Sequence, residues 1–436
     1  MKMKTQIAGF VCSALAAFAQ ANAGDVSPNV IYGQAPGSVD LAQNPSLANA
    51  ATRQYQKAVE LFAQARQPLA GPVDFRHKYV DMRLLSVAET GRTTCPAAMG
   101  ASFSTGSVAD NPSPAPLFPV GVTVDSLEWS ENAALAVLHR FLGGVFAVLW
   151  PLTKDPVYRA CQAPKPILLP TGVAHLNFKD IPMTPQIVPL QLLRIGNLAI
   201  AAVPAEVTTM AGRRLKRTAL DSLGGAGVDR AVIAGLANSY ASYVTTAEEY
   251  AMQSYEGAST QFGPDELLAF QQEFSRLGRA MVQGAQVAPG PLPQDVTGEV
   301  VNFVPGVVLD DKPLGKQFGD VITQPRASYA RGETVVAQFW GGHPRNDLRI
   351  QGSFLAVEKA VEGSDAFVPV AHDWDPETVY RWERVGVSYS RITVEWNTAD
   401  AGPGRYRIRH LGNWKSGWNG KIHPYEGLSD VFSVIP

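Results

Sequence analysis

The sequence predicts an α/β or α+β region over residues 1–286, followed by a β-sandwich over residues 311–436. Between residues 166 and 286, short apolar segments typical of buried strands alternate with segments of helical periodicity. A stretch rich in proline and glycine, residues 289–293, then ends this alternation and predicts a linker over residues 287–310. Beyond the linker, short segments of strand composition recur between Gly, Pro, Asn and Asp residues.

The length and composition are those of a folded protein with more than one domain. A chain of 436 residues is long enough for two or three hydrophobic cores. Hydrophobic residues make up 46% of the chain and charged residues 17%, which does not fit a disordered protein. The net charge of -2 offers no basic surface for a phosphate backbone, so we expect no nucleic-acid partner.

The sequence contains no segment with the length and apolarity of a transmembrane helix. Such a helix needs about 18 consecutive uncharged residues, and no apolar run reaches that length. The nearest candidate, residues 133–150, is interrupted by His139 and Arg140 and predicts a buried helix instead.

The N-terminal run of residues 22–29 supports two interpretations. The basic start, the apolar stretch of residues 7–19 and the sequence Ala21-Asn22-Ala23 are typical of a signal peptide cleaved after Ala23. Alternatively, residues 18–20 end a buried strand and residues 24–29 form an active-site loop that carries Ser27. The local sequence leaves both interpretations open.

The three cysteines bear on the cellular compartment. If Cys12 belongs to a leader, Cys95 and Cys161 remain as an even pair that could form one disulfide in an oxidising compartment.

The pattern along the chain predicts particular helices and strands. In the first region we expect helices over residues 46–66, 206–220 and 264–283, and strands over residues 167–169, 193–203 and 231–237. In the second region we expect strands at residues 333–339, 354–358, 391–396, 405–409 and 431–434.

Glu206 and Ser27 are the first candidates for a chemical role. Glu206 directly follows an apolar strand, where open α/β sheets place ligand-binding groups, although an acidic residue in the first turn of a helix is the more common explanation. Ser27 lies in a glycine-containing turn that would expose a hydroxyl group, but a serine in a turn more often caps backbone groups.

A segment rich in tyrosine follows another predicted strand. Residues 238–260 contain four tyrosines and three glutamates, which suggests a site, although tyrosines at strand ends often serve only in packing. The seven histidines form neither a His-x-His nor a His-x-x-x-His pattern, so the chain shows no histidine motif for a metal.

Several of these segments together resemble the neutral ceramidase family, in the same order and over nearly the whole chain. The matching segments are residues 24–29, 165–169, 206–214 and 243–260. Residues 393–396 and 404–409 resemble the C-terminal immunoglobulin-like domain of that family, so the resemblance implies an immunoglobulin-like fold for the predicted sandwich.

The resemblance implies zinc-dependent hydrolysis of the amide bond of ceramide, which gives sphingosine and a fatty acid. The family holds its zinc with two histidines, one glutamate and one tyrosine. Glu206 matches the glutamate and Tyr243 the tyrosine, while Ser27 matches the active-site serine and Tyr255 a tyrosine of the substrate pocket. The substrate would be a lipid presented by a membrane or micelle, and the protein would be secreted or periplasmic.

The match has one departure, at the N-terminus. The family supplies both zinc histidines from a long portion before the serine loop, whereas about 26 residues precede Ser27 here. We therefore expect either that a separate N-terminal half supplies the histidines, or that the chain is a truncated, catalytically inactive remnant that binds a lipid or a partner. A metal-independent serine amidase that uses Ser27 is a third hypothesis.

Overall fold

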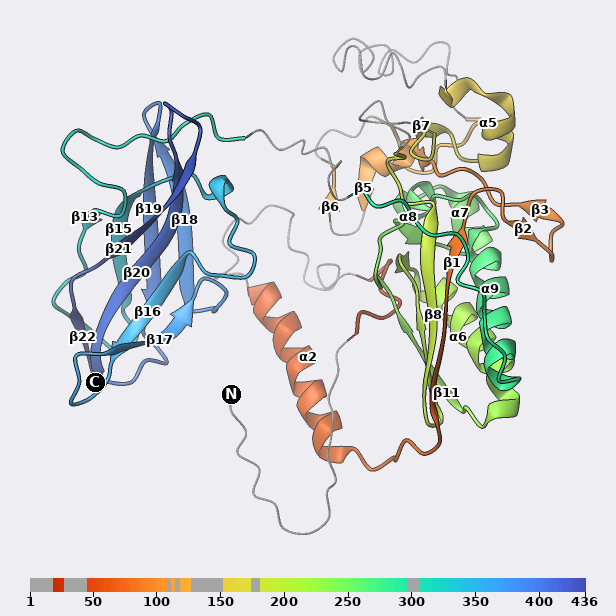
Figure 1. Ribbon diagram of the computed structural model, residues 1–436, viewed down its shortest axis with the longest axis horizontal. Coiled ribbons are helices and arrows are strands. Elements are labelled where there is room, and N and C mark those ends of the chain that lie inside the picture. Colours follow the sequence, from red (N-terminus) through yellow and green to blue (C-terminus); the bar gives the residue numbers. More distant parts are fainter. Residues whose placement is uncertain are drawn as a thin grey trace. The chain divides into compact units, whose positions relative to one another are not determined.

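The computed structural model describes residues 19–26, 45–107, 111–113, 118–126, 152–173, 181–296 and 306–436 (Figure 1). These residues divide between two compact units, one that extends to residue 296 and one that starts at residue 306. Ser27 and the helix predicted over residues 133–150 lie outside the described residues. Within the described part of the chain, no helix is both long and apolar enough to cross a membrane.

A four-stranded mixed sheet is the centre of the first unit. Its strands follow the order β1 (Val73–Asp81), β8 (Ile187–Ile195), β9 (Leu198–Ala202) and β11 (Arg230–Ala234). β1, β8 and β9 pair antiparallel, whereas β9 and β11 pair parallel. Helices α6 (Thr209–Leu223) and α9 (Glu266–Val282) lie on one side of this sheet (Figure 1) and share its apolar core.

The connection between β9 and β11 has the form expected for parallel strands. Two parallel neighbours need a long crossover, and here the crossover contains α6. The side chains of Ala211, Leu215 and Ala219 recur at helical spacing along α6 and are fully buried. The α/β character predicted for this region is thus confirmed by its mixed fold.

The strand predicted over residues 193–203 is wrong, because a turn divides it into β8 and β9. Gly196 has a φ of +62°, a backbone conformation that favours glycine. A Cβ atom at this position would lie 2.8 Å from the backbone of Ala70. The segment therefore forms a hairpin instead of one continuous buried strand.

The helix predicted to begin at Glu206 begins three residues later. Glu206 and Val207 form the short strand β10 (Glu206–Val207), which pairs parallel with β12 (Tyr243–Val244). The side chain of Thr208 accepts a hydrogen bond from the backbone N–H of Ala211 and caps α6. Glu206 is therefore a strand residue and not a first-turn helix residue.

The other elements of the first unit are shorter or lie apart from this sheet. The helices predicted over residues 46–66 and 264–283 and the strand predicted over residues 167–169 are confirmed. The helices are α2 (Pro45–Gln64), α5 (Pro156–Gln162), α7 (Ala247–Met252) and α8 (Tyr255–Ser259), with 3₁₀ turns η2 (Ala101–Thr105), η3 (Leu152–Lys154) and η4 (Gly224–Ala226). The short strands are β2 (Ser86–Val87), β3 (Arg92–Thr93), β4 (Met99–Gly100), β5 (Gly106–Ser107), β6 (Asn111–Pro112) and β7 (Ile167–Leu169).

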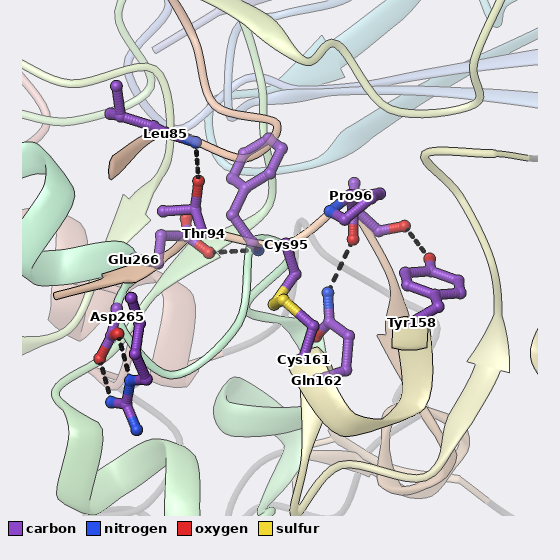
Figure 2. The surroundings of a disulfide bond; sticks show 12 residues. Leu85, Thr94, Cys95, Pro96, Tyr158, Cys161, Gln162, Asp265 and Glu266 are labelled. Carbon is purple, nitrogen blue, oxygen red and sulfur yellow. Dashed lines mark hydrogen bonds and ion pairs between the residues drawn. A yellow bond between two sulfur atoms is a disulfide. The ribbon is translucent and has the colours of Figure 1, made fainter. Parts of the chain in front are cut away.

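A disulfide joins Cys95 to Cys161 of α5, as the cysteine count suggested. Figure 2 shows its surroundings. The amide of Gln162, the residue next to Cys161, donates to the carbonyl oxygen of Pro96 at 2.8 Å. The hydroxyl of Tyr158 donates to the Ala97 carbonyl. α5 is thus tied to residues 95–97 by one covalent bond and two hydrogen bonds.

The second unit consists of two facing β-sheets. One has the order β13 (Val321–Thr323), β15 (Thr334–Gly341), β19 (Tyr389–Asn397) and β18 (Thr378–Val385). The other has the order β14 (Ser328–Ala330), β22 (Phe432–Ile435), β20 (Gly404–Lys415), β16 (Leu355–Ala360) and β17 (Phe367–His372), with β21 (Ile422–Leu428) paired to β20; the 3₁₀ turn is η5 (Pro344–Asn346).

Alternating residues from both sheets fill one shared core. Phe339 and Val394 contribute from the first sheet, and Tyr406 and Phe432 from the second, all of them buried. This arrangement is a β-sandwich. All five segments predicted as strands in this region lie on strands, while β13, β14, β17, β18 and β21 were not predicted.

Candidate active site

Glu206 and Tyr243 face each other across the parallel pair of β10 and β12. They are register partners in that pair. The phenol of Tyr243 forms a hydrogen bond with the Glu206 carboxylate, and the hydroxyl of Tyr240 donates to Glu206 Oε1 at 2.6 Å. Two phenol groups from one segment therefore meet the carboxylate of an adjacent strand.

The two phenols remain protonated in this arrangement. Burial raises the pKa of Tyr243 and of Tyr240, and the hydrogen bond to Glu206 raises both further. Each phenol thus acts as a hydrogen-bond donor to the carboxylate near neutral pH. Tyr240 itself remains 48% exposed, so the residue that donates to Glu206 lies at the protein surface.

Tyr255 lies beside the same cluster and comes from α8. Its ring meets that of Tyr243 edge to face, with 5.6 Å between the ring centroids. On the other side it stacks on Phe103 of η2, with 5.9 Å between the centroids. The ring of Tyr243, which lies beside Glu206, is thus the first of three aromatic rings in a row, followed by Tyr255 and then Phe103.

The described part of the N-terminal run lies against the strand of Glu206. The Gly24 N–H donates to the Val207 carbonyl oxygen at 2.9 Å, and a Cβ on Gly24 would come within 2.9 Å of the Glu206 carbonyl oxygen. The Asp25 carboxylate accepts hydrogen bonds from the Thr209 N–H and hydroxyl at 2.7 and 2.8 Å. Residues 24 and 25 thus join the start of α6 to the candidate site.

The structure thus brings together Glu206, Tyr243 and Tyr255 from the predicted set. It adds Tyr240 and Phe103, which the sequence did not single out. The only sequence signal for Tyr240 was its membership of the tyrosine-rich segment. Tyr250, from the same segment, is a core residue, 1% exposed, whose hydroxyl donates to the Gln162 carbonyl oxygen at 2.7 Å.

Few groups that could complete a metal site are present among the described residues. These residues contain no cluster of three or more His, Cys, Asp or Glu side chains. The described histidines instead lie beside aromatic rings: His77 by Tyr79, His343 by Trp382, His372 by Trp374, His410 by Phe339 and His423 by Trp414.

The donor chemistry of the site nevertheless fits half of a zinc ligand set. Zinc accepts oxygen ligands, and a carboxylate and a phenol already point at one position. A divalent cation would replace the proton that Tyr243 shares with Glu206, because a bound cation favours the deprotonated phenol. Glu206 and Tyr243 are therefore the residues that would hold the metal.

The chain thus has two units, and in the first unit the phenols of Tyr240 and Tyr243 meet the carboxylate of Glu206 at the β10–β12 strand pair. Residues 2–272 match the family model of the neutral/alkaline non-lysosomal ceramidase N-terminal region, and residues 274–434 match the model of the C-terminal region. The chain belongs to the neutral/alkaline non-lysosomal ceramidase family.

Relatives of known name share much of this sequence. The neutral ceramidase of Pseudomonas aeruginosa is 39% identical over 434 residues, a match that covers 98% of this chain and 61% of the relative. Neutral ceramidase B of Dictyostelium discoideum is 36% identical over 454 residues, which cover 96% of this chain and 60% of that protein. The chain thus spans about three-fifths of the length of these relatives.

Solved structures of ceramidases have a similar fold. The structure of a ceramidase complexed with C2 matches with a TM-score of 0.78 and 40% identity, over 96% of this chain and 63% of the other. A crystal structure of neutral ceramidase from Pseudomonas aeruginosa matches with a TM-score of 0.73 and 37% identity, over 96% of this chain and 62% of the other. Because these relatives are longer single chains, they give no support to a separate N-terminal half.

Proposed function

We propose that this protein hydrolyses the amide bond of ceramide in a zinc-dependent reaction, giving sphingosine and a fatty acid. The observation that carries the proposal is the convergence of Tyr240 and Tyr243 on Glu206 across β10 and β12. Membership of the ceramidase family supports the substrate class. The similarity of the fold to that of a ceramidase complexed with C2 supports the same class.

In this proposal Glu206 and Tyr243 hold the metal. Bound zinc would lower the pKa of a water molecule and polarise the amide carbonyl. Tyr240 does not bind the metal but donates a hydrogen bond to Glu206, which orients the carboxylate. The other ligands of a four-coordinate site would come from outside the described residues.

Ser27 and Tyr255 act on the substrate. Ser27 follows Gly24 by three residues, and Gly24 is hydrogen-bonded to β10. We assign to the Ser27 hydroxyl the orientation of the substrate and a hydrogen bond in the transition state. Tyr255 is held between Tyr243 and Phe103, and it would form part of the pocket for the substrate head group.

The domain organisation and the compartment belong to the same proposal. We assign residues 1–286 to the catalytic region, residues 287–310 to a linker and residues 311–436 to an immunoglobulin-like domain. The Cys95–Cys161 disulfide supports a secreted or periplasmic location, where such bonds persist. The protein would take its substrate from a membrane or micelle surface.

The test joins metal analysis to turnover. The purified chain is analysed for zinc and then assayed with a fluorogenic ceramide, next to the variants Glu206→Gln and Glu248→Gln. Glu248 is an exposed carboxylate paired with Arg214 at 3.0 Å, so it is a matched control. We expect zinc binding and turnover to fall in Glu206→Gln only.

Two outcomes would contradict the proposal. A chain with neither bound zinc nor turnover would be the inactive, lipid- or partner-binding remnant. Activity that survives a chelator but is lost in Ser27→Ala would instead indicate a metal-independent serine amidase.

A further inference from the structure

Lys165 is a buried lysine that none of the roles above explains. Its side chain is 0% exposed, although lysine is almost never fully buried without a partner. The Nζ atom donates to the carbonyl oxygen of Ala98 at 3.1 Å and to that of Thr260. It also lies 4.8 Å from the centroid of the Tyr250 ring.

The two carbonyl groups belong to two different segments, here called the walls of the tyrosine site. One wall carries Phe103, and the other carries Tyr243 and Tyr255. Ala98 precedes β4 and η2, and η2 carries Phe103. Thr260 follows α8, which carries Tyr255, and it forms a β-bridge with Tyr243. Phe103 and Tyr255 stack on each other. The ammonium group of Lys165 is therefore hydrogen-bonded to the backbone near each of these two stacked residues.

The chain is shaped to accommodate the stem of Lys165. Gly100 lies between Ala98 and Phe103, and a Cβ at this position would lie 2.8 Å from Lys165 Cγ. The same Cβ would lie 3.2 Å from the Cα of Ala258 in α8. A side chain at Gly100 would therefore push apart the two segments that Lys165 holds together.

A buried carboxylate accompanies the buried amine. Glu266 at the start of α9 is 0% exposed, and its Oε2 accepts the Phe262 N–H at 2.7 Å, while among the described residues no donor reaches its Oε1. Burial lowers the pKa of Lys165 and raises that of Glu266, and their mutual attraction opposes both shifts. Glu266 and Tyr250 are the titratable groups that face Lys165.

We propose that Lys165 is a positioning residue of the active site, because its ammonium sets the separation between the Phe103 wall and the wall of Tyr243 and Tyr255. This inference rests on the proposed function for its catalytic consequence, but its structural part does not. Catalytic groups must be held to within about 0.5 Å, and a displacement of about 1 Å can cost on the order of 100-fold in rate.

The test uses Lys165→Met in the full chain, since methionine keeps the length but cannot donate to the two carbonyls. We expect kcat with a short-chain ceramide to fall on the order of 100-fold with little change in KM. Hydrogen–deuterium exchange of the metal-free chain should rise in residues 98–105 and in residues 240–260, and not in residues 321–435.

Lys78→Met is the matched control. Lys78 lies on β1, and its Nζ is 2.7 Å from Oε2 of the buried Glu273, so its loss removes one of the two cations, with Arg276, that pair with a buried carboxylate. Among the described residues, Lys78 is not hydrogen-bonded to either wall of the tyrosine site. We therefore expect hydrogen–deuterium exchange in residues 98–105 and 240–260 of Lys78→Met to match that of the unaltered protein. Gly100→Ala serves as a second variant should Lys165→Met not fold, with the same expected pattern.

The outcomes separate this inference from the proposed function. Unchanged kcat and unchanged exchange in Lys165→Met would overturn the positioning role. If the unaltered chain has no ceramide turnover, the proposed function fails, while the exchange pattern still decides whether Lys165 joins the two walls. A rise in exchange in Lys165→Met and Lys78→Met alike would mean that Lys165 only stabilises the core, and would also overturn the inference.

Discussion

Tyr240 and Tyr243 both donate to Glu206, yet their positions in the chain give them different roles. Tyr243 belongs to β12 and is the register partner of Glu206, so the strand pair fixes it. Tyr240 precedes this strand and remains half exposed. In the proposed function the first residue therefore binds the metal directly, and the second orients the carboxylate.

Removal of each hydroxyl should affect zinc binding to a different extent. We expect Tyr240→Phe to weaken zinc affinity about 10- to 100-fold, the usual effect of losing a partner of a metal ligand. Tyr243→Phe should weaken it more, because a ligand is lost. Competition with a chelating dye measures both, and Tyr255→Phe, which should change KM and not zinc affinity, is the control. Equal affinities in all three variants would contradict the assigned roles.

His410 shows how burial in the sandwich makes one side chain sensitive to pH. Its ring lies on β20 in contact with the Phe354 carbonyl oxygen and the Tyr425 hydroxyl, each at 2.9 Å. Burial lowers the pKa of His410 from 6.5 to about 4. The neutral ring is therefore the form that the folded protein contains near neutral pH.

The second unit should lose stability in acid because of this histidine. As the pH falls below about 6.5, the unfolded chain takes up a proton that folded His410 does not accept until about pH 4. His410 thus makes its full contribution to the free energy of unfolding above pH 6.5. About 3 kcal/mol of this free energy is lost as the pH falls to 4. Urea unfolding between pH 7 and 4 measures this loss. The decrease in the free energy of unfolding with falling pH should be smaller in His410→Gln and unchanged in His423→Gln.

At the scale of the elements, α5 is attached to the first unit by a disulfide as well as by hydrogen bonds. The Cys95–Cys161 bond closes a loop of 66 residues, and Figure 2 shows it beside the hydrogen bond from Gln162 to Pro96. The Cys95 N–H also donates to the carbonyl oxygen of Phe262 at 3.0 Å. The disulfide therefore also adjoins the segment that leads into α9.

Removal of this disulfide should destabilise the first unit alone. For a loop of this length, the entropy of the unfolded chain predicts a loss of about 4 kcal/mol in Cys95→Ser/Cys161→Ser. Urea unfolding of the first unit measures this loss, and the unaltered protein under dithiothreitol is the comparison. A midpoint that does not move in either sample would show that other contacts hold α5.

The elements were predictable to different extents. The helices over residues 46–66 and 264–283 were correctly expected, because their apolar periodicity extends over many turns. The turn at Gly196 and the start of α6 at Thr209 were missed, because one glycine and one capping residue outweighed the apolar pattern around them. Local backbone geometry decided these boundaries.

At the scale of the whole molecule, the described residues form two units, each with its own apolar core. Pro289 lies at the start of the expected linker, and its carbonyl oxygen accepts the Tyr79 N–H at 2.7 Å, so this part of the linker packs on the first unit. Asp310 at the end of the linker accepts hydrogen bonds from the His343 N–H and the Lys415 N–H, both in the second unit.

The second unit should therefore fold by itself. We expect residues 306–436, expressed alone, to unfold in one cooperative transition, because the core of Phe339, Val394 and Phe432 lies entirely within this segment. Circular dichroism during thermal unfolding measures this. A fragment that starts at residue 321, and so lacks Asp310, should unfold at a lower temperature. A non-cooperative transition in the longer fragment would contradict the expectation.

The sequence by itself determined the α/β-then-β order of the chain, most of its long elements and the family to which it belongs. Those features follow from periodicity and from motifs that are local in the chain. Only the tertiary structure decided that Glu206 is a strand residue opposite Tyr243, that Tyr240 and Phe103 join the site, and that Lys165 connects its walls. The physical reason is that these contacts form between residues far apart in the chain, such as Lys165 and Thr260 or Phe103 and Tyr255, which no local pattern specifies.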